Sequence, residues 1–231
     1  MQSYHCVIEC KNLYLFLMPR KYPNIIITGT PGTGKTTTAT HLLELSKPST
    51  TTIPTPNIPL KLLNINQIAK KQDFYDSYDE ELQTHVVDED KLLDHIEELL
   101  EDGDGEGGWV VDWHVCDIFP ERWIDLVVVL RCDDTSVFYE RLAARQPSAA
   151  SDPTDGRSAD ERGYTGKKLE ENIDAEIFGT IADEAKEAWP DEGRVVELRS
   201  VEPEEIEANA ERILEWCRNW TRDQEEKEKN G

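Results

Sequence analysis

The sequence lacks a hydrophobic run long enough to cross a membrane. Its longest early apolar stretch covers residues 13–18, whereas a helix that spans a bilayer needs ~20 apolar residues. A signal peptide is not expected either, because no small-residue cleavage site follows this stretch and Pro19, Arg20 and Lys21 interrupt it. We therefore expect a protein without a membrane partner.

Positive charge is also scarce. The 231 residues include 25 lysines and arginines against 48 aspartates and glutamates, which gives a formal net charge of −23. Broad nucleic-acid binding needs clustered basic side chains, so we expect neither this nor direct sequence-specific binding to nucleic acid. An acidic surface can attract a basic protein partner or serve solubility alone, and the sequence leaves both interpretations open.

Cysteine and methionine are infrequent. The five cysteines are scattered, odd in number and without Cys-x-x-Cys spacing, which predicts reduced thiols in a reducing compartment instead of a disulfide framework or a zinc site. Methionine occurs only at Met1 and Met18. Translation that starts at Met18 would make residues 1–17 an artefact of the gene model, so we interpret residues 1–21 as an N-terminal extension outside the domain.

The most informative stretch that is present covers residues 29–37. It reads G-T-P-G-T-G-K-T-T and matches the phosphate-binding P-loop pattern. Its glycines let several backbone N–H groups point at a polyphosphate, and the helix expected after it adds the positive end of its dipole. Lys35 can reach the β- and γ-phosphate oxygens, and the Thr36 hydroxyl is placed to ligate Mg²⁺. A β-branched apolar run at residues 24–28 precedes the loop, as a buried strand requires.

A second nucleotide-binding signal lies at residues 109–114, which begin apolar and reach a carboxylate at Asp112. In P-loop proteins a buried strand of this kind delivers an aspartate to Mg²⁺. His114 follows two positions later, where a strand would turn its side chain to the same side as that of Asp112. This histidine either positions a water or a phosphate or is merely hydrogen-bonded at the end of a strand.

Strand-like and helix-like segments alternate along the chain, which predicts an α/β fold with a five-stranded parallel sheet and helices on both faces. In such a fold the nucleotide lies at the carboxyl ends of the strands. We expect strands at residues 24–28, 60–64, 109–114, 124–130 and 194–198. We expect helices after the P-loop and at residues 65–71, 88–101, 136–145, 167–189 and 203–220.

Other segments predict little regular structure. Residues 46–59 and 146–161 are rich in proline or small polar residues, so we interpret them as flexible insertions. Residues 73–81 are acidic and aromatic and are expected to form a loop. The charged tail at residues 221–231 is expected to fray, which leaves a single domain at residues 22–220.

The P-loop occurs together with several less common motifs. These are V-D-E-D at residues 87–90, V-D-W-H at 111–114, F-P-E-R-W at 119–123, V-L-R at 129–131, R-G-Y at 162–164 and E-E-N-I-D-A-E-I at 170–177. In this combination the chain resembles the eukaryotic adenylate kinase isoenzyme 6 family, a nuclear adenylate kinase that is also a ribosome-assembly ATPase. The resemblance covers residues 22 to about 220, apart from the two insertions.

The resemblance implies a small nucleoside monophosphate (NMP) kinase with an NMP-binding segment at residues 64–87 and a lid at residues 161–171. The implied reaction is the transfer of the ATP γ-phosphoryl group to AMP or another NMP with Mg²⁺, together with intrinsic ATP hydrolysis. It also implies a role in late small-subunit (18S rRNA) maturation through a basic small-subunit ribosomal protein of the pre-ribosomal small subunit. Cytoplasm and nucleus are the implied locations.

The family's site residues map onto this sequence one by one. The resemblance implies that the ATP phosphates are held by Gly32, Gly34, Lys35, Thr36, Thr37 and the lid arginine Arg162. It implies that Asp112 and Thr36 hold Mg²⁺, that His114 serves ATP hydrolysis, and that Asn64 and Lys70 contact the NMP.

The sequence departs from the family at several of these places. Arg145 is an alternative lid arginine, and we favour Arg162 because Gly-Tyr follows it as in the family. Lys70 and Lys71 stand where adenylate kinases carry an arginine, and a lysine lacks the bidentate geometry that holds a phosphate. Gln67 stands where the family usually has an acidic residue.

Three functions therefore remain open at this point. The first is an NMP kinase with side ATPase activity. The second is an ATP-gated ribosome-assembly factor in which kinase activity is incidental. The third is a small-molecule kinase of another P-loop branch, such as a shikimate-type kinase.

Overall fold

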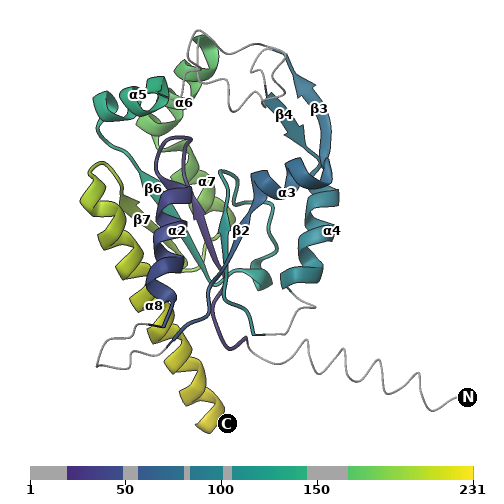
Figure 1. The fold of residues 1–231 in the computed structure, drawn as a ribbon, viewed down its shortest axis with the longest axis vertical. Coiled ribbons are helices and arrows are strands. Elements are labelled where there is room, and N and C mark those ends of the chain that lie inside the picture. The colour runs from purple at the N-terminus through teal and green to yellow at the C-terminus, as the bar shows by residue number, and fades with distance from the viewer. Residues whose placement is uncertain (1–19, 49–56, 81–83, 101–105, 145–165, 231) are drawn as a thin grey trace, which may run out of the picture.

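The computed structural model describes residues 20–48, 57–80, 84–100, 106–144 and 166–230. Its centre is a five-stranded sheet in the order β2-β5-β1-β6-β7, in which every pairing is parallel (Figure 1). The strands are β1 (Ile25–Thr28), β2 (Lys61–Asn64), β5 (Trp109–Asp112), β6 (Leu126–Arg131) and β7 (Val195–Arg199). The predicted five-stranded parallel sheet is confirmed.

Both faces of the sheet are covered by helices, as predicted. The described helices are α2 (Lys35–Ser46), α3 (Ile65–Gln72), α4 (Glu89–Leu100), α5 (Thr135–Ala144), α6 (Gly166–Phe178), α7 (Thr180–Ala188) and α8 (Pro203–Asn230), with the short 3₁₀ helix η1 (Glu121–Trp123). Figure 1 shows α2 and α8 together on one side of the sheet and α7 on the other.

The three central strands, β1, β5 and β6, are mainly apolar because both of their faces are buried. Side chains alternate between the faces, so Ile25 and Ile27 pack with α2 and α8, whereas Ile26 packs with α4 and α7. All three isoleucines are fully buried, and burial of each contributes ~1.5–3 kcal/mol before conformational costs. Continuous runs of this kind are typical of parallel strands and explain why β1 could be recognised from the sequence.

The helix expected over residues 167–189 is two helices, so this prediction is wrong. Gly179 separates α6 from α7 and adopts a left-handed conformation with φ of 71°. A Cβ atom at this position would lie 2.8 Å from the Arg131 guanidinium. The sequence pattern did not indicate the break because helical periodicity continues on both sides of it, and the close approach of Arg131 is a tertiary contact.

The segment expected to be a loop at residues 73–81 contains β3 (Tyr75–Asp79), which is a second correction. This strand pairs antiparallel with β4 (Thr84–Val87) to form a two-stranded hairpin, seen at the upper right of Figure 1. Tyr75 stacks on His85 with ring centroids 4.5 Å apart, and Tyr78 meets the same ring edge-on at 5.0 Å. Because the hairpin is largely exposed, its sequence lacks the apolar alternation that identifies strands in a core.

Helix α8 is the third correction, because it continues to Asn230 through the tail that was expected to fray. The tail consists largely of Arg, Gln, Glu and Lys, which all favour helix, and has no proline or glycine before residue 231. The buried face of α8 lies earlier in the helix and is formed by Asn209, Ala210, Ile213, Leu214 and Cys217. Trp216 and Trp220, on the same helix, are only half-buried.

Several expectations fall on residues outside the described ranges. Residues 1–19, 49–56 and 145–165 are among these, so both candidate lid arginines and all of the N-terminal extension except Arg20 and Lys21 lie outside the description. The expected insertion at 46–59 is partly structured, because Ile58 is 2% exposed and packs in the core beside α2 and α8. Among the described helices, none is long and apolar enough to cross a membrane.

The cysteines that the structure describes are free thiols. Cys116, Cys132 and Cys217 are all buried and form no disulfide. Burial raises the pKa of Cys116 and of Cys217 to about 12, so these two thiols stay protonated near neutral pH. The expectation of reduced cysteines therefore holds for this part of the chain.

Candidate functional site

The loop between β1 and α2 has the backbone that a phosphate-binding loop needs. Gly29, Gly32 and Gly34 have φ angles of 137°, 101° and 91°, a region that side chains with a Cβ rarely adopt. At Gly29 a Cβ atom would also lie 2.5 Å from the carbonyl oxygen of Leu130. Glycine at these positions therefore follows from backbone conformation and close packing.

Helix α2 begins immediately after this loop and leaves its amino end open to a ligand. Its N-cap is Gly34, which has no side chain with which to cap the first-turn N–H groups, and the first turn carries no acidic residue. Backbone N–H groups and the positive end of the helix dipole both favour an anion at such an end. The amides of Lys35, Thr36 and Thr37 belong to this first turn, as predicted from the sequence.

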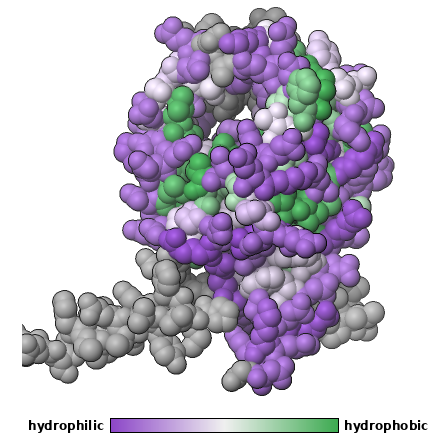
Figure 2. Space-filling model, turned by 180° about the vertical axis from the view of Figure 1, so that it is seen from behind, coloured by the Kyte–Doolittle hydropathy of each residue, from purple (hydrophilic) through white to green (hydrophobic). Residues whose placement is uncertain are grey.

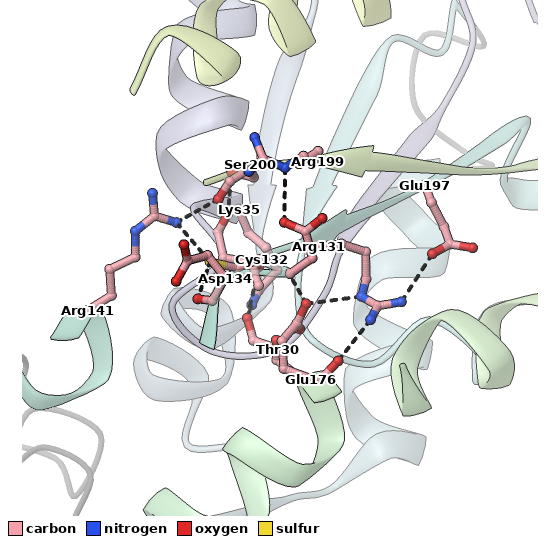
Figure 3. Close-up of polar contacts among 12 residues, drawn as sticks. Thr30, Lys35, Arg131, Cys132, Asp134, Arg141, Glu176, Glu197, Arg199 and Ser200 are labelled. Carbon is pink, nitrogen blue, oxygen red and sulfur yellow. Dashed lines mark hydrogen bonds and ion pairs between the residues drawn. The ribbon is translucent and has the colours of Figure 1, made fainter. Parts of the chain in front are cut away.

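Lys35 lies across the loop that it is expected to serve. Its Nζ donates hydrogen bonds to the carbonyl oxygens of Gly29 at 2.7 Å and Thr30 at 2.9 Å. The ammonium group is thus held at the mouth of the loop by the loop's own backbone (Figure 3). This places a positive charge beside the backbone N–H groups that would bind a polyphosphate.

Asp112 joins the P-loop to the carboxyl edge of the sheet. Its Oδ2 accepts hydrogen bonds from the Thr36 Oγ1 at 2.6 Å and from the Asn64 Nδ2 at 2.7 Å, and the residue is only 3% exposed. The sheet register accounts for this meeting, since Asn64 and Asp112 pair at the ends of β2 and β5. The predicted proximity of Asp112 and Thr36 is therefore observed.

The Thr36–Asp112 pair fits Mg²⁺ in its chemistry. Mg²⁺ prefers hard oxygen ligands and is usually bound through one or two carboxylates together with substrate phosphates. Within the described residues no group of three or more His, Cys, Asp and Glu side chains could hold a metal. A magnesium ion here would accordingly be held by the Asp112 carboxylate, the Thr36 hydroxyl and the phosphates of a nucleotide.

His114 does not lie on the strand, so the expectation that a strand turns it to the same side as Asp112 is wrong. Strand β5 ends at Asp112, Trp113 is buried, and His114 is exposed in the bend that follows. Its main-chain oxygen accepts a hydrogen bond from Thr28 Oγ1 at 2.9 Å, and its ring meets the Trp113 ring edge-on at 5.3 Å. The bend still places His114 beside the end of β1, and its role in ATP hydrolysis stays a prediction.

The two residues predicted to contact an NMP differ in their environments. Asn64 is already engaged, because its Oδ1 accepts from the backbone N–H of Gln67 at 2.9 Å and so caps α3. Lys70 lies exposed in the last turn of α3. Their contact with a nucleotide stays a prediction, as does that of Arg162, which lies outside the described residues.

The structure adds polar groups beside the P-loop that the sequence did not single out. Ser200 Oγ donates to the carbonyl oxygen of Thr33 at 2.8 Å, so the connection between β7 and α8 abuts the loop. Arg141 donates to the carbonyl oxygens of Ser200, at 2.7 Å, and Val201, which fastens the same connection to α5 (Figure 3). No local sequence pattern signals these contacts.

Arg131 is the second cation that sequence reasoning missed, although it belongs to the V-L-R motif. It lies at the end of β6 and pairs with Glu176 at 3.0 Å and Glu197 at 3.1 Å (Figure 3). Partial burial alone would lower the pKa of Arg131, but the hydrogen bonds and charges of the two glutamates outweigh burial and raise it. Arg131 is therefore held as a cation at the same edge of the sheet as Asp112.

A large cavity lies at the opposite end of the sheet from this site. It has a volume of about 940 Å³ and is lined by Tyr22, Leu45, Ile58 and Leu214 together with charged side chains of α8. None of the residues predicted to bind nucleotide or metal lines this cavity. The candidate site at the P-loop edge therefore lies apart from this cavity.

Comparison with known proteins finds both a family profile and solved structures that match the chain. A family profile described as an AAA domain matches residues 25–179. A solved shikimate kinase from Bacteroides thetaiotaomicron aligns over 84% of this chain and 97% of its own, with a TM-score of 0.42 and 13% identity.

Two curated relatives match most of the chain. The adenylate kinase isoenzyme 6 homolog HBR1 of Candida albicans is 47% identical over 201 residues, which cover 86% of this chain and 71% of the relative. The adenylate kinase isoenzyme 6 homolog FAP7 of Saccharomyces cerevisiae is 43% identical over 202 residues, which cover 87% and 85%. With its P-loop, its Asp112–Thr36 pair and this identity over most of its length, the chain belongs to the adenylate kinase isoenzyme 6 homolog family.

Proposed function

We propose that the protein transfers the γ-phosphoryl group of ATP to a nucleoside monophosphate, AMP in the first place, and hydrolyses ATP when no acceptor is bound. The observation that carries the proposal is the hydrogen bond between Thr36 and Asp112 beneath an uncapped helix end. It unites a phosphate-binding loop with a carboxylate suited to Mg²⁺. The names of the relatives support the choice of AMP.

Each predicted residue has a role in this reaction. The first-turn amides of α2 and the Lys35 ammonium hold the ATP phosphates, and Thr36 and Asp112 hold Mg²⁺. The ion, when bound, neutralises phosphate charge. Arg162 stabilises the charge that develops on the transferred group. Phosphoryl transfer depends chiefly on positioning and electrostatic stabilisation, which is what a rigid loop with a fixed lysine supplies.

The acceptor side of the proposal rests on residues 64–87. Asn64 and Lys70 contact the NMP, with Lys70 as a point charge toward its phosphate. His114, exposed beyond Asp112, positions the water that attacks when ATP is hydrolysed without an acceptor. Asn64 lies beside Asp112 at the end of β2, and Lys70 lies exposed in the last turn of the helix that follows, which supports this assignment.

A second function is compatible with the same site. In it, ATP binding changes the affinity of the protein for a basic small-subunit ribosomal protein on the pre-ribosomal small subunit, and hydrolysis releases that partner. The favouring observation is the charge of −23 together with exposed acidic residues on and beside the β3–β4 hairpin, namely Asp73, Asp76 and Glu80. Figure 2 shows a mostly hydrophilic surface with separate hydrophobic groups. This function carries with it a cytoplasmic and nuclear location.

One assay separates the two functions. ADP formation from ATP and Mg²⁺ is measured with and without AMP, and with and without a purified basic small-subunit ribosomal protein. A kinase shows fast AMP-dependent ADP formation that the ribosomal protein barely changes. An assembly factor shows little response to AMP and an ATP hydrolysis rate that changes when the ribosomal protein binds. If Asp112→Asn protein turns over ATP as fast as wild type, the site itself is wrongly assigned.

A further inference from the structure

Glu176 is a buried carboxylate for which the proposed reaction has no use. It lies near the end of α6, in the E-E-N-I-D-A-E-I motif, and is only 4% exposed. Glutamate is almost never this buried unless it is paired. A buried ion pair often contributes less to stability than apolar side chains of similar volume would. Stability alone therefore does not explain why Glu176 is buried at this position.

The contacts of Glu176 join α6, β6 and the P-loop. Its Oε2 accepts a hydrogen bond from the Thr30 hydroxyl. Its Oε1 accepts from Arg131 Nε at 3.0 Å and from the backbone N–H of Cys132 at 2.7 Å. Its main-chain oxygen accepts from Arg131 Nη2 at 2.8 Å. Figure 3 shows the carboxylate between Thr30 on one side and Arg131 on the other.

Thr30 connects this carboxylate to Lys35. While the hydroxyl of Thr30 donates to Glu176, its carbonyl oxygen accepts the Lys35 Nζ at 2.9 Å and the Thr33 hydroxyl at 2.9 Å. Thr30 is itself 2% exposed. Thr30 therefore links the two residues, because its side chain is bound by Glu176 and its carbonyl oxygen binds Lys35.

We propose that Glu176 is a positioning residue for nucleotide binding, because its carboxylate fixes Thr30 and so sets the P-loop geometry that receives Lys35 and the phosphates. The inference rests on the proposed function in so far as the ligand is a nucleoside triphosphate. Beyond that function, the affinity for phosphate then depends on Glu176, which is remote in sequence from both the P-loop and Asp112. The contact between Thr30 and Glu176 spans 146 positions.

Glu197 provides a matched control. Like Glu176 it pairs with Arg131, at 3.1 Å through Nη1, and it also pairs with Lys186 at 2.6 Å. The hydrogen bonds of the Glu197 side chain lead to Arg131 and Lys186, not to the P-loop. A change at Glu197 therefore perturbs the same arginine without touching Thr30.

The test is a double-mutant cycle read by calorimetric binding of ATP in the presence of Mg²⁺. Thr30→Val and Glu176→Gln each keep side-chain size and should each weaken binding about tenfold, while the double variant should be little weaker than either single variant, as expected for coupled neighbours. Thr30→Ser, which restores the hydroxyl, should recover most of the affinity lost in Thr30→Val. Glu197→Gln should bind within about twofold of wild type and add independently to Thr30→Val.

Melting temperatures of the same variants separate positioning from stability. If Glu176→Gln lowers the melting temperature but leaves ATP affinity unchanged, or if its effect simply adds to that of Thr30→Val, Glu176 is only structural and the proposal is overturned. If Glu176→Gln does not fold, the comparison of Thr30→Val with Thr30→Ser decides, because equal affinities would overturn the proposal. AMP phosphorylation by the wild type is measured separately, so failure of the proposed kinase reaction is distinguishable from failure of this coupling.

Discussion

Two regions of the molecule are stabilised by opposite kinds of contact. One is the edge of the sheet that carries the P-loop and Asp112, here called the phosphate edge, and the other is the β3–β4 hairpin, here called the arm. Asp112 and Glu176 at the phosphate edge are 3% and 4% exposed and are bound by residues 76 and 146 positions away. The arm is held by contacts among near neighbours, such as Tyr75 and Tyr78 on His85, and Tyr78 is 42% exposed. A region with few buried contacts opens at low free-energy cost, so the phosphate edge is preorganised and the arm is adaptable.

The two regions should differ in how they affect the kinetics of the reaction. Preorganised polar groups contribute most where charge develops during reaction, whereas adaptable segments commonly close over a second substrate. Changes at the phosphate edge should therefore affect every nucleotide-dependent activity by large factors. Changes in the arm should affect the acceptor alone and by small factors.

The largest effect is expected from Lys35→Met. Removal of the ammonium group that bonds to the Gly29 and Thr30 carbonyls should lower ATP turnover about a thousandfold, the upper range for loss of one preorganised donor. Steady-state ADP formation with saturating ATP measures it. Lys47→Met, at an exposed position just after α2, serves as the control. A loss below tenfold would mean that the phosphate edge does not depend on this lysine.

Asp112→Asn should have the next largest effect. The amide keeps the size of the side chain but removes the carboxylate charge that we assign to Mg²⁺, so turnover should fall about a hundredfold and half-maximal activity should need more Mg²⁺. A Mg²⁺ titration of the rate is the measurement, with the exposed Asp117→Asn as control. An unchanged Mg²⁺ requirement would remove Asp112 from the metal site.

Lys70→Met examines the acceptor side, on α3 just before the β3–β4 arm. Because Lys70 is exposed at the end of α3, its contact with a phosphate should resemble an exposed ion pair, and KM for AMP should rise about two- to fivefold. KM for ATP is the internal reference, and Lys71→Met shows which of the two lysines faces the acceptor. If KM for ATP rises as much as that for AMP, Lys70 does not serve the acceptor alone, and the proposed difference between the two regions is wrong.

Glu205→Gln should have the smallest effect, which is on thermal stability. Glu205 lies beside the phosphate edge, at the start of α8. Glu205 accepts from the backbone N–H groups of Glu202 at 2.9 Å and Val201 at 2.7 Å in the connection that abuts Thr33. These backbone bonds, with Arg199, lower its pKa below the usual 4.5. A lowered folded-state pKa stabilises the fold above the unfolded-state pKa, and this stabilisation is lost as pH falls through the folded-state pKa.

The measurement is a pair of thermal melts between pH 7 and pH 3. Glu205→Gln should melt about 1–3 °C below wild type at pH 7, as expected for a partly exposed charged contact. The difference should vanish in acid, where the wild-type carboxyl is also neutral. Glu204→Gln, at the neighbouring exposed position, is the control. A difference that stays constant across this pH range would show that charge at Glu205 plays no part.

Much of the phosphate edge could be predicted because its signals are local. The P-loop glycines, Lys35 and Thr36 lie within nine consecutive residues, and the positive φ angles of the loop together with its close packing explain why glycine is needed at its positions. Asp112 could be placed because parallel strands end at one edge of a sheet. The hairpin in the arm was missed because an exposed strand has no apolar alternation to identify it.

The sequence by itself determined the alternation of strands and helices, the P-loop and the aspartate that meets it, because each depends on neighbouring residues or on one periodic pattern. Only the tertiary structure decided that Gly179 divides a helix, that His114 leaves its strand, and that Glu176 is bound to Thr30. These features arise where Arg131, a bend after β5 and the P-loop bring distant segments into contact. Such contacts depend on how elements pack against one another, and no short stretch of sequence contains that information.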